Sequence, residues 1–86
     1  MINEDYYIEG LNKEENSIFA RTVSLLDNFI FMIPNINPEY LGLIKKLQGK
    51  TPINYITRGR INIIKEIKYE LQNEYIIVTF IKEDRN

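Results

Sequence analysis

The sequence contains no cysteine, no histidine and no tryptophan, and its only alanine is Ala20. Without cysteine the chain has neither a disulfide framework nor a thiolate metal site, and without histidine it lacks the most common metal ligand and general base. We therefore expect no metal and no other cofactor. The absence of cysteine also fits a reducing compartment.

Long apolar runs are missing as well. No stretch approaches the roughly 18 residues that a membrane span requires. The N-terminal residues 1–5 are acidic and lack the basic start of a signal peptide. These features predict a cytoplasmic protein that does not interact with a membrane.

The residues that are present favour a β-sheet. The 86-residue chain is long enough for one domain, residues 1–86, and it carries sixteen isoleucines, six tyrosines and four phenylalanines. Branched and aromatic side chains suit a pleated, half-buried surface, whereas helical bundles rely on alanine and leucine. Because a domain of this size buries little surface, a homo-oligomer is a further expectation.

The first third of the chain predicts short strands. Residues 6–8 form a strand candidate that Gly10 closes, and residues 12–16 form a polar turn. Residues 17–26 and 29–33 are apolar and β-branched, with a tight turn at 27–28, and they indicate a meander. The continuous run at 29–33 is typical of a strand covered on both faces. A helix over 17–33 is the alternative.

The clearest helix signal lies at about 38–48. Asn37 is a suitable N-cap, Pro38 occupies the first helical position, and Glu39 places a negative charge in the first turn. Gly49 is suited to the left-handed conformation that closes a helix. One face carries the apolar residues at helical spacing, namely Tyr40, Leu41, Ile44 and Leu47.

The last third of the chain predicts three more strands. Residues 53–56 and 61–72 flank a turn at 58–60, and the alternation over 61–72 favours a strand, although the same residues also fit one helical face. Residues 75–81 are apolar on both faces and predict a central strand. The expected fold class is α+β, a single small domain with an antiparallel sheet of five or six strands and one helix.

No catalytic motif is visible. The carboxylates do not cluster, and the sequence has no phosphate-binding glycine loop and no metal-ligand spacing. One cationic arrangement remains, in which Arg58, Arg60, Lys65 and Tyr69 would stabilise a phosphorane in a nuclease. The alternative is that these residues only solvate a turn and a strand. We expect a protein that is not an enzyme.

Charge is segregated along the chain. Residues 1–39 carry seven acidic and two basic residues, for a net charge of −5, whereas residues 40–65 carry six basic and no acidic residues, for +6. A basic segment of this kind can contact phosphates, and tyrosines beside it can stack on bases if they are exposed. The candidate residues for nucleic acid or another anionic partner are Lys45, Lys46, Lys50, Arg58, Arg60, Tyr40 and Tyr55.

The same segment carries a local resemblance. Asn37-Pro38-Glu39-Tyr40-Leu41, Lys45-Lys46, Gly49-Lys50-Thr51-Pro52, Tyr55 and Arg60 resemble a helix-turn-helix segment of the AraC-type transcription regulators. The resemblance implies a helix in the DNA major groove, followed by a linker helix. The spacing between Pro38 and Gly49 is one residue short, and Gly59 falls where the linker helix would continue.

Two functions fit these features. The leading hypothesis is a small regulatory or inhibitor-type protein that acts by stoichiometric binding to another protein, and it includes a homodimer. An edge strand rich in isoleucine and tyrosine can pair with another chain. The aromatic residues available as anchors are Tyr6, Tyr7, Phe29, Phe31 and Phe80. The alternative is a nucleic-acid-binding regulator that uses the basic segment 45–60.

Overall fold

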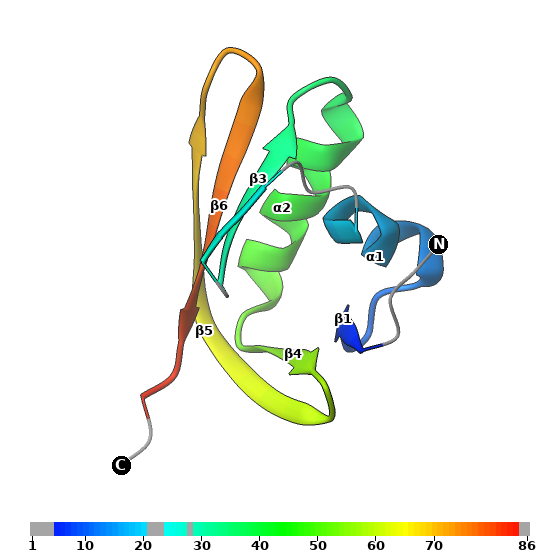
Figure 1. Ribbon diagram of the computed structural model, residues 1–86, viewed down its shortest axis with the longest axis vertical. Helices are drawn as coiled ribbons and strands as arrows, with labels where there is room; N and C mark the ends of the chain where they lie inside the picture. Colours follow the sequence, from blue (N-terminus) through cyan, green and yellow to red (C-terminus); the bar gives the residue numbers. More distant parts are fainter. Residues whose placement is uncertain (1–4, 21–23, 28, 85–86) are drawn as a thin grey trace.

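In the described part of the chain, the strands form one antiparallel sheet with the order β1-β4-β5-β6-β3-β2, and two helices pack on it (Figure 1). The computed structural model describes residues 5–20, 24–27 and 29–84. The elements are β1 (Tyr6–Ile8), α1 (Lys13–Ala20), β2 (Ser24–Asp27), β3 (Ile30–Pro34), α2 (Pro38–Lys50), β4 (Ile53–Thr57), β5 (Arg60–Leu71) and β6 (Tyr75–Lys82). The fold is a small α+β domain, as the composition predicts.

The 12-residue strand β5 joins the two parts of the sheet. Its first half pairs with β4, up to the pair Ile53–Ile64, and its second half pairs with β6, down to the pair Leu71–Ile76. The register shifts between Ile64 and Glu66, and an irregularity of this kind bends a strand and increases its twist. The sheet therefore curls, and α2 lies on its concave side (Figure 1).

The hydrophobic core fills the space between the concave face and the helices. Alternate residues of β3 and β6 point inward and are buried, and α2 contributes Tyr40, Leu43, Ile44 and Leu47. Ile18 and Phe19 of α1 pack against the same cluster. The most completely buried side chains are Ile8, Ile33, Ile44, Leu47, Ile64, Ile76 and Val78. This inner face is where the branched side chains gain most from burial.

Several predicted elements are confirmed. Residues 6–8 form a strand, and Gly10 follows it with φ 93°. Residues 60–71 form a strand rather than a helix, so the period-2 pattern was the correct one. β6 lies between β5 and β3, which confirms its central position. Asn37 caps α2 as predicted, because its side-chain oxygen accepts a hydrogen bond from the Glu39 N–H at 2.9 Å.

The prediction of one helix was wrong, because residues 13–20 form a second helix, α1. The residues assigned to a polar turn form its N-terminus instead. Asn12 Oδ1 accepts from the Glu15 N–H at 2.8 Å, and Glu15 Oε1 accepts from the Asn12 N–H at 3.2 Å. This reciprocal pair is a capping box, which satisfies backbone donors that the first helical turn leaves without partners. The spacing from Asn12 to Glu15 was the signal in the sequence.

The helix predicted at about 38–48 is α2, but Gly49 does not close it as predicted. α2 continues through Gly49 to Lys50, and Gly49 is not among the glycines with positive φ, which are Gly10 and Gly59. The helix ends at Thr51, whose hydroxyl donates to the Gln48 carbonyl at 2.9 Å. A hydroxyl therefore satisfies one terminal carbonyl, and a left-handed glycine is not needed.

The expectation that 29–33 and 75–81 are covered on both faces was wrong as well. In β3 and β6, each buried residue alternates with one of intermediate exposure. The second apolar row, which includes Met32 and Ile77, lies on the outer face of the sheet, away from both helices. In this protein, the continuous apolar runs therefore form strands whose outer face remains partly exposed.

The resemblance to AraC-type regulators does not extend to the fold. After α2 the chain turns at Pro52 into β4 and then β5, so strands occupy the place of the second DNA-binding helix and the linker helix. The apolar face of α2 is buried against the sheet through Tyr40 and Leu43. The predicted meander is only partly testable, because residues 21–23 and Asn28 of the predicted turn lie outside the described residues.

Loss of the capping box should destabilise the fold. We expect Asn12→Ala to lower the free energy of unfolding by about 1 kcal/mol, because the first turn of α1 loses its side-chain acceptor. Urea denaturation measures this difference. Asn73→Ala, in the exposed β5–β6 turn, is the matched control and should change stability little. Equal stabilities for the two variants would contradict the role of Asn12.

Candidate functional site

The predicted basic residues of α2 are exposed, and one of them is neutralised. Lys45, Lys46 and Lys50 lie on the exposed side of the helix. Lys46 Nζ forms an ion pair with Glu15 Oε2 of α1 at 3.1 Å. Glu14 and Glu39 also line the hollow between the helices that contains Lys46. The acidic first third of the chain therefore folds against the basic segment at this point.

These contacts lower the pKa of the Glu15 carboxylate. The hydrogen bond from the Asn12 backbone, followed by the hydrogen bond from the Lys46 ammonium, holds the pKa of Glu15 below its ordinary value of 4.5. Both interactions favour the charged carboxylate. The contact thus ties the start of α1 to the middle of α2.

Arg58 and Arg60 lie apart from these lysines, at the tip of the β4–β5 hairpin. Arg58 and Gly59 both have positive φ, 47° and 79°, as in a type I′ two-residue turn. The Arg58 guanidinium lies 5.8 Å from the centre of the Tyr6 ring. The five residues of β4 separate this tip from the end of α2, a strand length of about 17 Å.

Tyr40 and Tyr55 do not meet the condition for stacking on bases, because each is only 6% exposed. Tyr55 packs edge-on against Phe80 with ring centres 5.4 Å apart, and it also contacts Phe29 and Phe31. Burial, followed by the nearby Tyr6, raises the pKa of the Tyr55 hydroxyl above 10. Both tyrosines are core residues.

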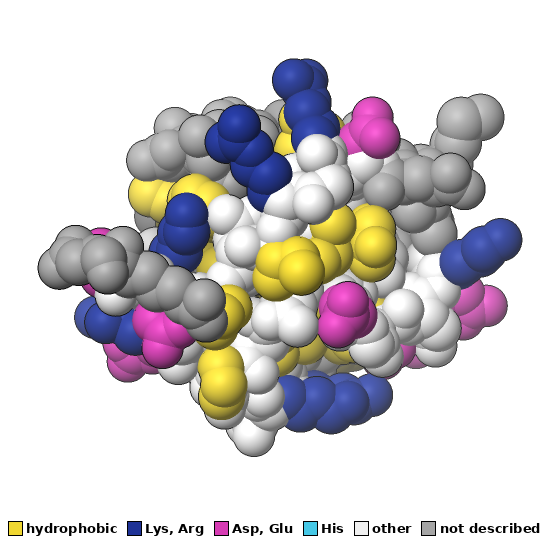
Figure 2. Space-filling view, turned by 90° about the horizontal axis from the view of Figure 1, so that it is seen from below, with side chains coloured by type: hydrophobic (Ala, Val, Ile, Leu, Met, Phe, Trp, Pro, Cys, Tyr) yellow, Lys and Arg dark blue, Asp and Glu magenta, His cyan; other side chains and the backbone are white. Residues whose placement is uncertain are grey.

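The structure does not gather the predicted cations into one surface. The face in Figure 2 shows hydrophobic side chains near its centre and Lys and Arg side chains that stand apart around it, with acidic side chains between them. The nuclease arrangement is not assembled either. Tyr69 packs against the core, whereas Lys65 lines a hollow on the outer face of the sheet.

The outer face of the sheet carries the feature that sequence reasoning missed. The cross-strand pairs Met32–Ile77 and Ile30–Thr79 place apolar side chains from β3 and β6 in one row. The charged side chains of β5, Glu66, Lys68 and Glu70, are exposed beside this row. The half-exposed apolar residues of the outer face are Ile30, Met32, Ile63, Ile77 and Ile81. We call this row, with its charged margin on β5, the outer face.

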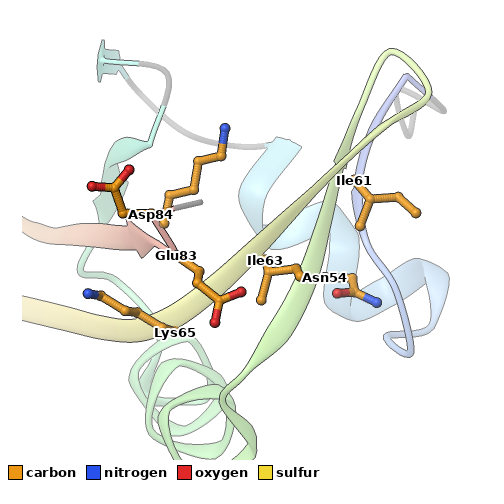
Figure 3. A pocket seen from close by; sticks show the side chains of 7 residues that line it. Asn54, Ile61, Ile63, Lys65, Glu83 and Asp84 are labelled. Carbon is orange, nitrogen blue, oxygen red and sulfur yellow. The ribbon is translucent and has the colours of Figure 1, made fainter. Parts of the chain in front are cut away.

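A hollow of about 850 Å³ continues the outer face toward the β4–β5 hairpin. In Figure 3, Ile63 lies between Lys65, Glu83 and Asp84 on one side and Asn54 and Ile61 on the other. Ile61 is 64% exposed, which is unusual for so large an apolar side chain. The hollow combines an apolar floor with charges of both signs, so it has no preference for an anion.

The described residues contain neither a group of three or more metal-ligating side chains nor a helix long and apolar enough to cross a membrane. No protein-family model, curated protein or solved structure matches the chain. The assignment of a function therefore depends on the surfaces described above.

The Glu15 contact predicts a specific dependence on pH. Because the folded state lowers the pKa of Glu15, its contribution to stability is present above pH 4.5 and is lost as the pH falls through the lower folded-state value. As the pH is lowered from 7 through this acidic range, we expect the free energy of unfolding to fall less for Glu15→Gln than for the unmodified protein. Urea denaturation at several pH values measures the difference. Glu14→Gln makes the same charge change on the same helix, and an equal effect from it would contradict this assignment.

Proposed function

We propose that this chain is a small, non-catalytic cytoplasmic protein that acts by stoichiometric binding to another protein through its outer face. The observation that supports the proposal is the row of half-exposed apolar side chains on β3 and β6, which neither helix covers. Burying such a row against a partner would remove apolar surface from water, which is the main source of binding free energy.

The composition of the outer face supports a protein partner. Protein–protein interfaces combine an apolar centre with a polar margin. Here Met32, Ile77 and Ile81 form the centre, and Lys68 and Glu70 form part of the margin. Because the margin carries both signs of charge, it favours a partner with a mixed charged surface over a polyanion.

The nucleic-acid alternative has weaker support. Phosphate binding requires several cations on one surface, and aromatic side chains must be exposed to stack on bases. Tyr40 and Tyr55 are buried, and Lys46 is paired with Glu15. Lys45, Lys50, Arg58 and Arg60 remain exposed, so this alternative now depends on these four residues.

A charged substitution in the outer face should weaken binding strongly. We expect Ile77→Glu to weaken capture of the partner from a lysate of the native host by at least about 30-fold, because a carboxylate replaces a central apolar contact. Ile36→Glu is the matched control, since Ile36 is 78% exposed in the loop between β3 and α2. Circular dichroism should show the same fold for both variants.

The same experiment separates the two functions. A protein partner should remain bound at high salt and should be lost with Ile77→Glu. Retention of nucleic acid that falls steeply with salt, and that disappears in the variant Lys45→Glu/Arg58→Glu, would favour the alternative. Equal capture by Ile77→Glu and Ile36→Glu would exclude the outer face as the binding surface.

A further inference from the structure

β5 has an open edge where β4 leaves it. The last pair between β4 and β5 is Ile53–Ile64, but β5 continues to Leu71 with β6 on its other side. In Figure 1 this half of β5, coloured yellow to orange, runs beside β6 at the border of the sheet. The unpaired part covers residues 67–71, a strand length of about 17 Å.

The hydrogen-bond pattern identifies the backbone groups at this edge. The Gln72 N–H donates to the Tyr75 carbonyl, on the β6 side of β5. In an antiparallel ladder successive residues alternate between the two sides, so the backbone groups of Ile67, Tyr69 and Leu71 point away from β6. Gln48 confirms this direction, because its Nε2 donates to the Ile67 carbonyl at 2.9 Å from α2.

Among the described residues, most of these groups have no partner. Within residues 5–20, 24–27 and 29–84, no hydrogen bond reaches the outward N–H and C=O of Tyr69 or Leu71. The edge at β1 differs, since the Asn16 side chain bonds both the N–H and the C=O of Ile8. Exposed strand edges readily pair with another chain unless a protein blocks them. Asn16 blocks β1 at Ile8, whereas no described residue forms a hydrogen bond that blocks β5 at Tyr69 or Leu71.

The sequence of the open edge is complementary to itself. Residues 67–71 read Ile-Lys-Tyr-Glu-Leu, so an antiparallel copy centred on Tyr69 places Lys68 opposite Glu70 and Ile67 opposite Leu71. A two-fold axis makes each of these contacts twice. Lys68 and Glu70 are both exposed, and Leu71 is 53% exposed.

The alternative registers are less favourable. A pairing centred on Lys68 would place two ammonium groups opposite each other, and one centred on Glu70 would place two carboxylates opposite each other. Like charges directly opposite destabilise a strand pair. Only residues 67, 69 and 71 present their backbone groups outward, and Tyr69 is the centre that uses all three.

We propose that two copies of this chain associate through the open edge of β5, antiparallel, with Tyr69 opposite Tyr69 of the second copy. The Ile67 carbonyl can accept a second hydrogen bond beside that from Gln48, because a carbonyl oxygen has two lone pairs. The contact is short, so the dimer is a weak one that depends on concentration. The inference does not rest on the proposed function, although Lys68 and Glu70 also border the outer face.

The test reverses the charges of Lys68 and Glu70, first one at a time and then both together. Sedimentation of the purified chain from about 1 μM to about 1 mM should show a monomer–dimer equilibrium. Lys68→Glu and Glu70→Lys should each raise the dissociation constant about tenfold, since both symmetric contacts change from attraction to repulsion. The double exchange Lys68→Glu/Glu70→Lys should restore the dissociation constant of the unmodified chain. Glu66→Lys is the control, because Glu66 would lie opposite Gln72 and the dimer should change little.

Hydrogen exchange locates the contact independently. The amides of Tyr69 and Leu71 should become protected as the concentration rises, and the single exchanges should remove this protection. A chain that stays monomeric throughout, or a dimer that the double exchange fails to rescue, overturns the proposal. Protection of the two amides only when an extended peptide is added would assign the edge to a different partner. Sedimentation and hydrogen exchange use the purified chain alone, so their results do not depend on whether a protein partner is captured from the lysate.

Discussion

Contact between the rings of Phe31, Tyr55 and Phe80 is the constraint on which the curled sheet depends. These side chains come from β3, β4 and β6, and their ring centres lie 4.9–5.9 Å apart. Because β4 and β3 are not neighbours in the sheet, the rings hold its two ends together across the concave side. Edge-on and tilted pairs of this kind are favourable beyond the burial of their surface. The rings thus hold in place the curl that the register shift in β5 introduces, and β4 pairs with β5 only as far as Ile64.

Local patterns predicted most of the elements, since the signals in this chain are mostly short-range. The alternation over residues 61–72 and the Asn37-Pro38 cap both reflect neighbours in sequence, and the structure agrees with each. The second helix was missed although its capping box is equally local, because β-branched residues after Ser17 favoured a strand. Tertiary contacts of Phe19 with Phe31 and Phe80 override that preference. Intrinsic propensity was too weak a guide for so short a segment.

The candidate site could not be predicted in the same way, because charge along a chain says little about charge in space. Lys46 comes from the basic segment and Glu15 from the acidic one, yet they form an ion pair. Tyr55 lies between basic residues in the sequence, but the alternation of β4 turns its side chain into the core. The apolar row on the outer face could not be predicted because a continuous apolar run is typical of a strand covered on both faces, whereas this face is only partly covered.

The two surfaces proposed for binding meet at β5, which carries both the charged margin of the outer face and the open edge. A strand of 12 residues between partners of five and eight residues leaves part of each edge without a strand partner. The bulge at Ile64–Glu66 turns the strand, so α2 covers its inner side while Lys68 and Glu70 remain exposed on the outer side. The charges that border the outer face are therefore also those that set the register of the open edge. A single strand thus brings an apolar face and a self-complementary edge next to each other.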